Sequence, residues 1–61
     1  MARIKIEQLD AEGEVFRTFE QFPTEEQVPE RLERIAYAYC LEHTRVSVDG
    51  VVVPLTREKV A

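Results

Sequence analysis

The sequence predicts a single small α+β domain with the element order ββαββ, in which two β-hairpins form an antiparallel or mixed four-stranded sheet and one amphipathic helix packs on one face. Three observations carry this prediction: an alternating N-terminal segment, a central helical stripe of apolar residues, and an Asp-Gly turn between two apolar segments. A chain of 61 residues has room for one domain only.

The first hairpin is predicted from residues 2–9 and 14–21. Two isoleucines alternate with charged residues in the first of these strands, which is the period-2 pattern of a half-buried strand. A polar connection containing Gly13 follows. In the second strand, Phe16 and Phe19 are three residues apart and cannot share one face of a regular strand. We expect either a bulge between them or one phenylalanine that points away from the core.

The middle of the chain predicts a short turn at residues 24–28 and a main helix from Pro29 to His43. Thr24 with Gln27 three residues later has the form of a capping box, and proline fits the first position of a helix. One stripe around this helix, typical of a buried face, contains Val28, Leu32, Ile35, Ala36, Tyr39 and His43.

The second hairpin is predicted at residues 44–48 and 51–55, because Asp49-Gly50 is the preferred dipeptide of a two-residue type I′ turn. Such a turn fixes the register, which pairs Val48 with Val51, Val46 with Val53 and Thr44 with Leu55. A polar tail, residues 56–61, ends the chain.

The element order and length resemble the small immunoglobulin-binding domains of bacterial surface proteins, as does the helix fragment at residues 36–39, Ala-Tyr-Ala-Tyr. The resemblance implies a last strand in the centre of the sheet. Pro54 indicates the opposite, because its missing N–H would face away from residues 44–48 and deprive a central strand of a donor. We therefore expect the last strand either to lie at an edge or to end its outer pairing at Pro54.

Charge and composition restrict the partners and the compartment. The net charge is −4, and residues 1–30 hold eight acidic and three basic side chains. Such a surface repels phosphate backbones, which disfavours direct binding of nucleic acid. The longest aliphatic run, residues 51–53, is far shorter than a membrane span. One cysteine and an N-terminus without an apolar signal core predict a cytoplasmic protein.

The sequence offers little for catalysis, so we expect no enzyme, no cofactor and no metal. Ser47 is predicted in a strand without a nucleophile-elbow sequence around it. Cys40 and His43 lie three apart on the predicted helix, but two ligands do not complete a structural zinc site unless a symmetric dimer doubles them. The simpler interpretation is that Cys40 packs as an apolar residue and His43 caps the helix C-terminus.

Two apolar patches are the candidate interaction sites. Tyr37 and Leu41, flanked by Arg34, are predicted on the helix face opposite the core, and tyrosine with arginine is the composition of many binding hot spots. Val52, together with whichever of Phe16 and Phe19 turns outward, is predicted to form a second patch on the open side of the sheet.

These features predict a small non-enzymatic protein-interaction module, an adaptor, inhibitor or accessory subunit, that self-associates as a homodimer through the open sheet or the back of the helix. The alternative is an acidic, nucleic-acid-mimicking inhibitor of a basic protein, such as a phage-encoded decoy. The charge of residues 1–30 favours this alternative, and a steep dependence of affinity on salt would distinguish it from an apolar contact.

Overall fold

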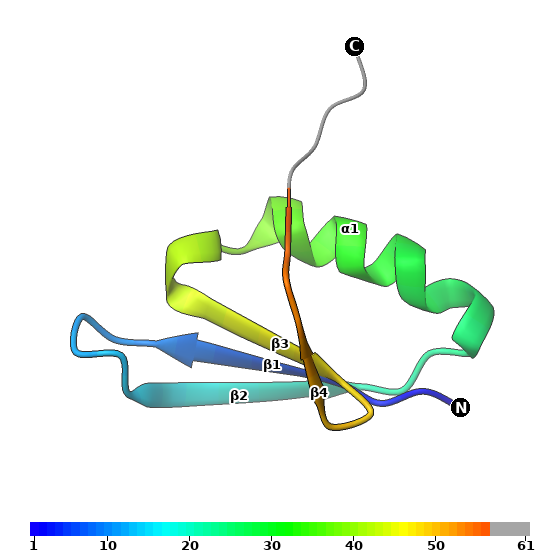
Figure 1. Cartoon of the computed structure of the whole chain (residues 1–61), viewed down its shortest axis with the longest axis horizontal. Helices are drawn as coiled ribbons and strands as arrows, with labels where there is room; N and C mark the ends of the chain where they lie inside the picture. Colours follow the sequence, from blue (N-terminus) through cyan, green and yellow to red (C-terminus); the bar gives the residue numbers. More distant parts are fainter. Residues whose placement is uncertain (57–61) are drawn as a thin grey trace, which may run out of the picture.

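The computed structural model describes residues 1–56 and has a helix over one face of a four-stranded sheet, as predicted (Figure 1). All strand pairs are antiparallel, and the strand order is β2-β1-β3-β4. The predicted tail lies outside the described residues, apart from Thr56. The elements are β1 (Ile4–Leu9), β2 (Val15–Gln21), the 3-10 turn η1 (Glu25–Gln27), α1 (Val28–Ala38), the 3-10 turn η2 (Leu41–His43), β3 (Thr44–Val48) and β4 (Val51–Val53).

The core lies between α1 and the two central strands. Ile4 and Ile6 of β1 and Val46 of β3 are almost completely buried and pack with Ile35 of α1. Burying an isoleucine side chain contributes about 1.5–3 kcal/mol, so these few contacts carry much of the stability of so small a domain. Partly buried side chains surround this cluster: Leu32, Tyr39, Val48, Val53 and Leu55.

The first hairpin contains a bulge at Phe16. Gln8 pairs with Arg17 and Leu9 with Val15, so Phe16 is an extra residue on β2. Phe19 lies directly opposite the buried Ile6 and therefore faces the helix side of the sheet. Both expected explanations for the spacing of the two phenylalanines thus apply: the strand is irregular, and Phe16 is the residue left outside the core.

The register of the second hairpin is as predicted at the turn. Val48 pairs with Val51 and Val46 with Val53, and both turn residues have positive φ, 51° at Asp49 and 86° at Gly50, as a type I′ turn requires. The predicted strand end at residue 55 is wrong, because β4 ends at Val53 and no Thr44–Leu55 ladder pair forms.

The chain leaves the sheet after β4 and crosses α1 at a steep angle (Figure 1). Leu55 packs against the core there instead of extending the ladder, and Pro54 and Leu55 line the same pocket as Leu32 and Tyr37. β4 is consequently a short edge strand, as Pro54 predicted. The central place next to β1 belongs to β3, so the strand order differs from the one that the resemblance to immunoglobulin-binding domains implied.

The helix begins as predicted and ends early. The Thr24 N–H donates a hydrogen bond to Gln27 Oε1 (3.1 Å), which is one half of the predicted capping box. The predicted end at His43 is wrong: α1 ends at Ala38, and Tyr39 is extended (φ −118°, ψ 157°). The chain instead enters β3 at Thr44 through an extended residue and the 3-10 turn η2.

A reversal at residues 39–43 replaces the predicted last helical turn. The Thr44 hydroxyl and the His43 N–H both donate to the Cys40 carbonyl, at 2.7 and 3.1 Å, and stabilise this reversal. Tyr39 still reaches the core, but from an extended residue, whereas His43 is exposed in η2. His43 therefore does not cap the main helix.

Candidate interaction surface

The first predicted patch does not form on the helix. Leu41 lies in η2, beyond the end of α1, so it is not one helical turn from Tyr37. Tyr37 is 50% exposed and lines a pocket of about 270 Å³ beside residues 54–56. Arg34 stays one helical turn from Tyr37 within α1 and forms an exposed ion pair with Glu30 (3.8 Å). The structure therefore keeps Arg34 and Tyr37 as neighbours and separates Leu41 from them.

The second predicted patch is also divided. Val52 is on β4 and Phe16 on β2, the two opposite edges of the sheet, with β1 and β3 between them. Neighbouring strands lie about 4.8 Å apart, so the two side chains are about 14 Å or more from each other. Phe19 faces the helix side. Among residues 1–56, no single apolar patch spans the open face.

The open face between the edges carries charged pairs. Arg3 Nε donates to Glu20 Oε2 at 2.7 Å, and Arg45 Nε donates to Glu7 Oε1 at 2.9 Å across β1 and β3. The hydrogen bond from Arg45, together with its positive charge and that of Lys5, holds the pKa of the Glu7 carboxyl below its ordinary value of 4.5. This face is therefore a poor surface for apolar self-association.

Half of the exposed large apolar side chains of the described residues lie along one edge of the sheet, which we call the aromatic edge: β2 and the residue that follows it. Val51 and Val52 are exposed on β4, at the opposite edge. Phe16 is 62% exposed, Phe22 57%, Val15 41% and Phe19 38%. β2 has seven residues and includes neither lysine nor proline, two residues that commonly protect edge strands. A long, exposed, aromatic edge of this kind is unusual in a protein that works alone.

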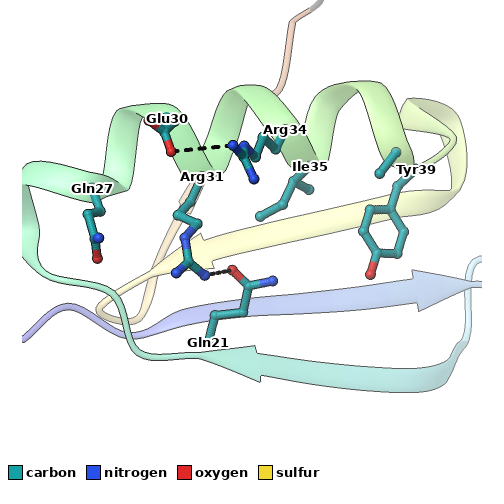
Figure 2. A pocket seen from close by; sticks show the side chains of 8 residues that line it. Gln21, Gln27, Glu30, Arg31, Arg34, Ile35 and Tyr39 are labelled. Atoms are coloured by element: carbon teal, nitrogen blue, oxygen red, sulfur yellow. Dashed lines mark hydrogen bonds and ion pairs between the residues drawn. The ribbon is translucent and has the colours of Figure 1, made fainter.

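A groove separates the aromatic edge from α1 (Figure 2). Its volume is about 370 Å³, and Arg31 spans it from the helix by donating to Gln21 Oε1 at 3.0 Å. Tyr39 points down from the chain after α1 (Figure 2), and its ring lies 6.3 Å from that of Phe19. The groove leaves the helix-facing side of β2 only partly covered, which explains the partial exposure of Phe19.

The backbone hydrogen bonds show which groups of β2 face solvent. The Ala2 N–H donates to the Pro23 carbonyl (2.9 Å), and this pair continues the register of β1 with β2. Every second pair of an antiparallel ladder exchanges hydrogen bonds, so Phe19 and Gln21 bond to β1. Thr18 and Glu20 belong to the alternate pairs, with Glu7 and Lys5, and direct their N–H and C=O groups away from the sheet.

Five of the eight acidic side chains in residues 1–30 lie at two ends of the molecule. Asp10, Glu12 and Glu14 are in the β1–β2 turn, whereas Glu25 and Glu26 begin the helical segment at the opposite end (Figure 1). The Asp10 carboxylate accepts the N–H groups of residues 12 and 14, both at 2.9 Å, and so stabilises its turn. The eight acids of residues 1–30 do not form one continuous array.

Cys40 and His43 do not form a metal centre with other ligands in the described part of the chain. Cys40 is exposed, and within residues 1–56 no group of three or more histidine, cysteine, aspartate or glutamate side chains is placed to hold a metal ion. None of the helices over the same residues has the length and apolar character needed to cross a membrane.

Sequence reasoning named Phe16 and Phe19 but missed Val15 and Phe22, whose exposure depends on the edge position of β2.

No protein-family model, curated protein or solved structure matches this chain with significance.

Proposed function

We propose that this protein is a small non-enzymatic interaction module that binds another polypeptide through its aromatic edge. The observation that carries this proposal is the coincidence, on one strand, of exposed aromatic side chains with outward backbone groups at Thr18 and Glu20. An extended chain that adds to a sheet edge uses both, because main-chain hydrogen bonds give affinity and alternate side chains give specificity.

The groove beside the edge supports the same proposal. A strand added next to β2 would place every second side chain on the helix side, against Phe19 and near the polar groups of Gln21 and Arg31. Aromatic and arginine side chains are enriched where binding energy concentrates. The edge therefore combines a template for pairing with a surface that can select a sequence.

The acidic mimic of nucleic acid has less support. A decoy needs a run of negative charge comparable to a phosphate backbone, whereas the acids here are divided between two ends, and Glu7 and Glu20 are paired with arginines. The two functions differ in their salt dependence. Affinity that falls steeply with salt would favour the mimic, and affinity that hardly changes would favour the aromatic edge.

Site-specific photo-crosslinking in the native host tests the proposal. We would replace Phe16 with p-benzoylphenylalanine and, as a matched control, replace Tyr37, an aromatic residue of similar exposure outside the aromatic edge. We expect a discrete crosslinked protein from position 16, either a second copy of this chain or another protein, and none from position 37. Crosslinks from position 37 alone, or from neither position, would overturn the proposal.

A further inference from the structure

We propose that the polypeptide bound at the aromatic edge is a second copy of this chain, with the two β2 strands antiparallel about a two-fold axis at Phe19. This inference rests on the proposed function and specifies its partner. The dimer would join two four-stranded sheets into one of eight strands. It differs from association through the open sheet face, which the charged pairs on that face disfavour.

The outward backbone groups restrict the register. Thr18 and Glu20 present N–H and C=O groups to solvent, whereas Phe19 and Gln21 use theirs toward β1. A symmetric antiparallel pair must join outward groups to outward groups, so its axis passes through a residue and not between two residues. β2 has seven residues, so at least five pairs within the strand form only when the axis lies at Arg17, Thr18 or Phe19.

Charge and the bulge distinguish these three positions. An axis at Arg17 places two arginines directly opposite each other, which is destabilising. An axis at Thr18 places Phe16 opposite Glu20 and includes the bulged residue of both copies, where the ladder is irregular. An axis at Phe19 uses only the regular residues 17–21, and it places Thr18 opposite Glu20 and Arg17 opposite Gln21. No like charges are then directly opposed.

The register centred on Phe19 also gathers the aromatic rings. The two Phe19 residues form a pair without mutual hydrogen bonds, the kind in which Cα atoms approach to about 4.5 Å. Arg17 already lies over the Phe19 ring of its own chain, 5.8 Å from the centroid, and is a diagonal neighbour of Phe19 in the second copy. Phe16 of one copy and Phe22 of the other then adjoin the same end of the paired segment 17–21.

The remaining charge on the edge is already compensated. Glu20 accepts a hydrogen bond from Arg3 of its own chain (2.7 Å), so the diagonal approach of the two Glu20 side chains does not bring together two unpaired carboxylates. Two five-residue segments bury less than the roughly 1,200 Å² of a standard stable interface. We therefore expect a reversible dimer whose population changes over micromolar to millimolar concentrations.

Opposite charges at Thr18 test the register by sedimentation equilibrium. In the register centred on Phe19, Thr18→Glu creates two glutamate–glutamate pairs with Glu20, whereas Thr18→Lys creates two lysine–glutamate pairs. We expect the dimer dissociation constant to rise about tenfold in the first variant and to fall several-fold in the second. In a register centred on Thr18, both variants oppose like charges and both weaken the dimer.

The control variants are Val52→Glu and Val52→Lys on the opposite edge, an exposed strand residue like Thr18. Neither should alter the dissociation constant. Thermal unfolding of all four variants in dilute solution separates an effect on the fold from an effect on association, because Thr18 also pairs with Glu7 within the monomer. Equal weakening by both Thr18 variants, or no change in either, would overturn the inference.

A single-cysteine scan gives a second, independent measurement. In a Cys40→Ser background, which removes the one cysteine of the chain, we would introduce Thr18→Cys, Phe19→Cys or Glu20→Cys and compare the rates of disulfide-linked dimer formation. Only the residue on the two-fold axis faces itself at the separation that a disulfide requires. Fastest crosslinking at position 19 supports the inference, and fastest crosslinking at position 18 or 20 overturns it.

Failure of the dimer and failure of the interaction module are distinguishable. If the protein sediments as a monomer at all accessible concentrations while Phe16→p-benzoylphenylalanine crosslinks to a different protein, the second-copy inference is wrong and the proposed function stands. If the monomer also yields no crosslinks from position 16, both are wrong.

Discussion

The two edges of the sheet differ in the length of the strand and in the side chains that the strand exposes. β4 has three residues and is followed by Pro54, after which the chain leaves the sheet and packs Leu55 against the core. β2 has seven residues, and the exposed side chains along it and just after it include three phenylalanines. One edge is short and is ended by the course of the chain, whereas the other offers outward donors and acceptors over its whole length.

This difference shows that edge protection in a small domain need not be uniform. Edge strands pair readily with other chains, and natural proteins commonly shorten, charge or cover them. β4 follows that rule by its shortness, whereas β2 follows it only through the bulge at Phe16 and the charged side chains of Arg17 and Glu20. In a domain with so few core residues, an exposed edge strand is better explained by a binding role of that edge than by the absence of any role.

The largest expected effect distinguishes a residue that stabilises the fold from a residue that is available for contact with a partner. Ile6→Ala removes a completely buried side chain opposite both Phe19 and Val46, and should cost about 2–5 kcal/mol of unfolding free energy. Phe16→Ala, at an exposed position, should change it by less than about 0.5 kcal/mol. Chemical denaturation measures both values. If Ile6→Ala leaves no folded protein, Ile6→Val, with an expected cost of about 0.5–1.5 kcal/mol, takes its place. A large loss from Phe16→Ala would assign the aromatic edge to the fold.

The next largest effect concerns the turn that positions β4, the short edge strand. Gly50 has φ 86° in the turn that leads into β4, so Gly50→Ala should cost about 1–2 kcal/mol through backbone strain. Asp49→Asn is the control, because asparagine also tolerates the left-handed region. Denaturation midpoints compare the two variants with the wild type. An unchanged midpoint for Gly50→Ala would mean that β4 does not depend on this turn.

Amide exchange compares the edges directly. If the aromatic edge pairs with a second copy, the amides of Thr18 and Glu20 should exchange about three- to tenfold more slowly above the dissociation constant than below it. The outward amide of Val52, on β4, should exchange at the same rate at both concentrations. Nuclear magnetic resonance at two protein concentrations resolves these amides individually, and equal slowing at Val52 would contradict the distinction between the edges.

The smallest expected effect lies on the charged face between the edges. The folded chain lowers the pKa of Glu7 through its hydrogen bond with Arg45, so the unfolded chain takes up a proton first as pH falls. The resulting stabilisation is present above about pH 4.5 and is lost as pH drops through the lowered value. Glu7→Gln should flatten this part of the stability profile, measured by thermal unfolding between neutral and acidic pH. An unchanged slope would show that the pair contributes no stability.

Local patterns predicted the elements well where turn chemistry and apolar periodicity agree. Asp49-Gly50 specified both a turn type and a register, and the structure has both. The end of the helix was mispredicted because residues 39–43 contain no glycine cap and Tyr39 continues the apolar stripe. The reversal depends on how the chain enters β3, and helical periodicity does not describe such a relation between two elements.

The candidate site was predicted in part for the same reason. Phe16 and Phe19 stood out because their spacing conflicts with a regular strand. Which strand lies at an edge depends on the pairing of β1 with β3. In the sequence, only Pro54 indicated that the last strand lies at an edge. Tyr37 and Leu41 were grouped by helical spacing, and their grouping failed once the helix ended at Ala38.

The pairing of β1 with β3 also has a consequence for how the chain acquires its structure during synthesis. Ile4 pairs with Val48, so β1, one of the two central strands, receives its second neighbour only after the helix and β3 have been synthesised. Contacts between such distant residues slow folding. Because β2 is synthesised before the helix and the second hairpin, we expect its edge to be exposed to other chains earlier than the edge of β4.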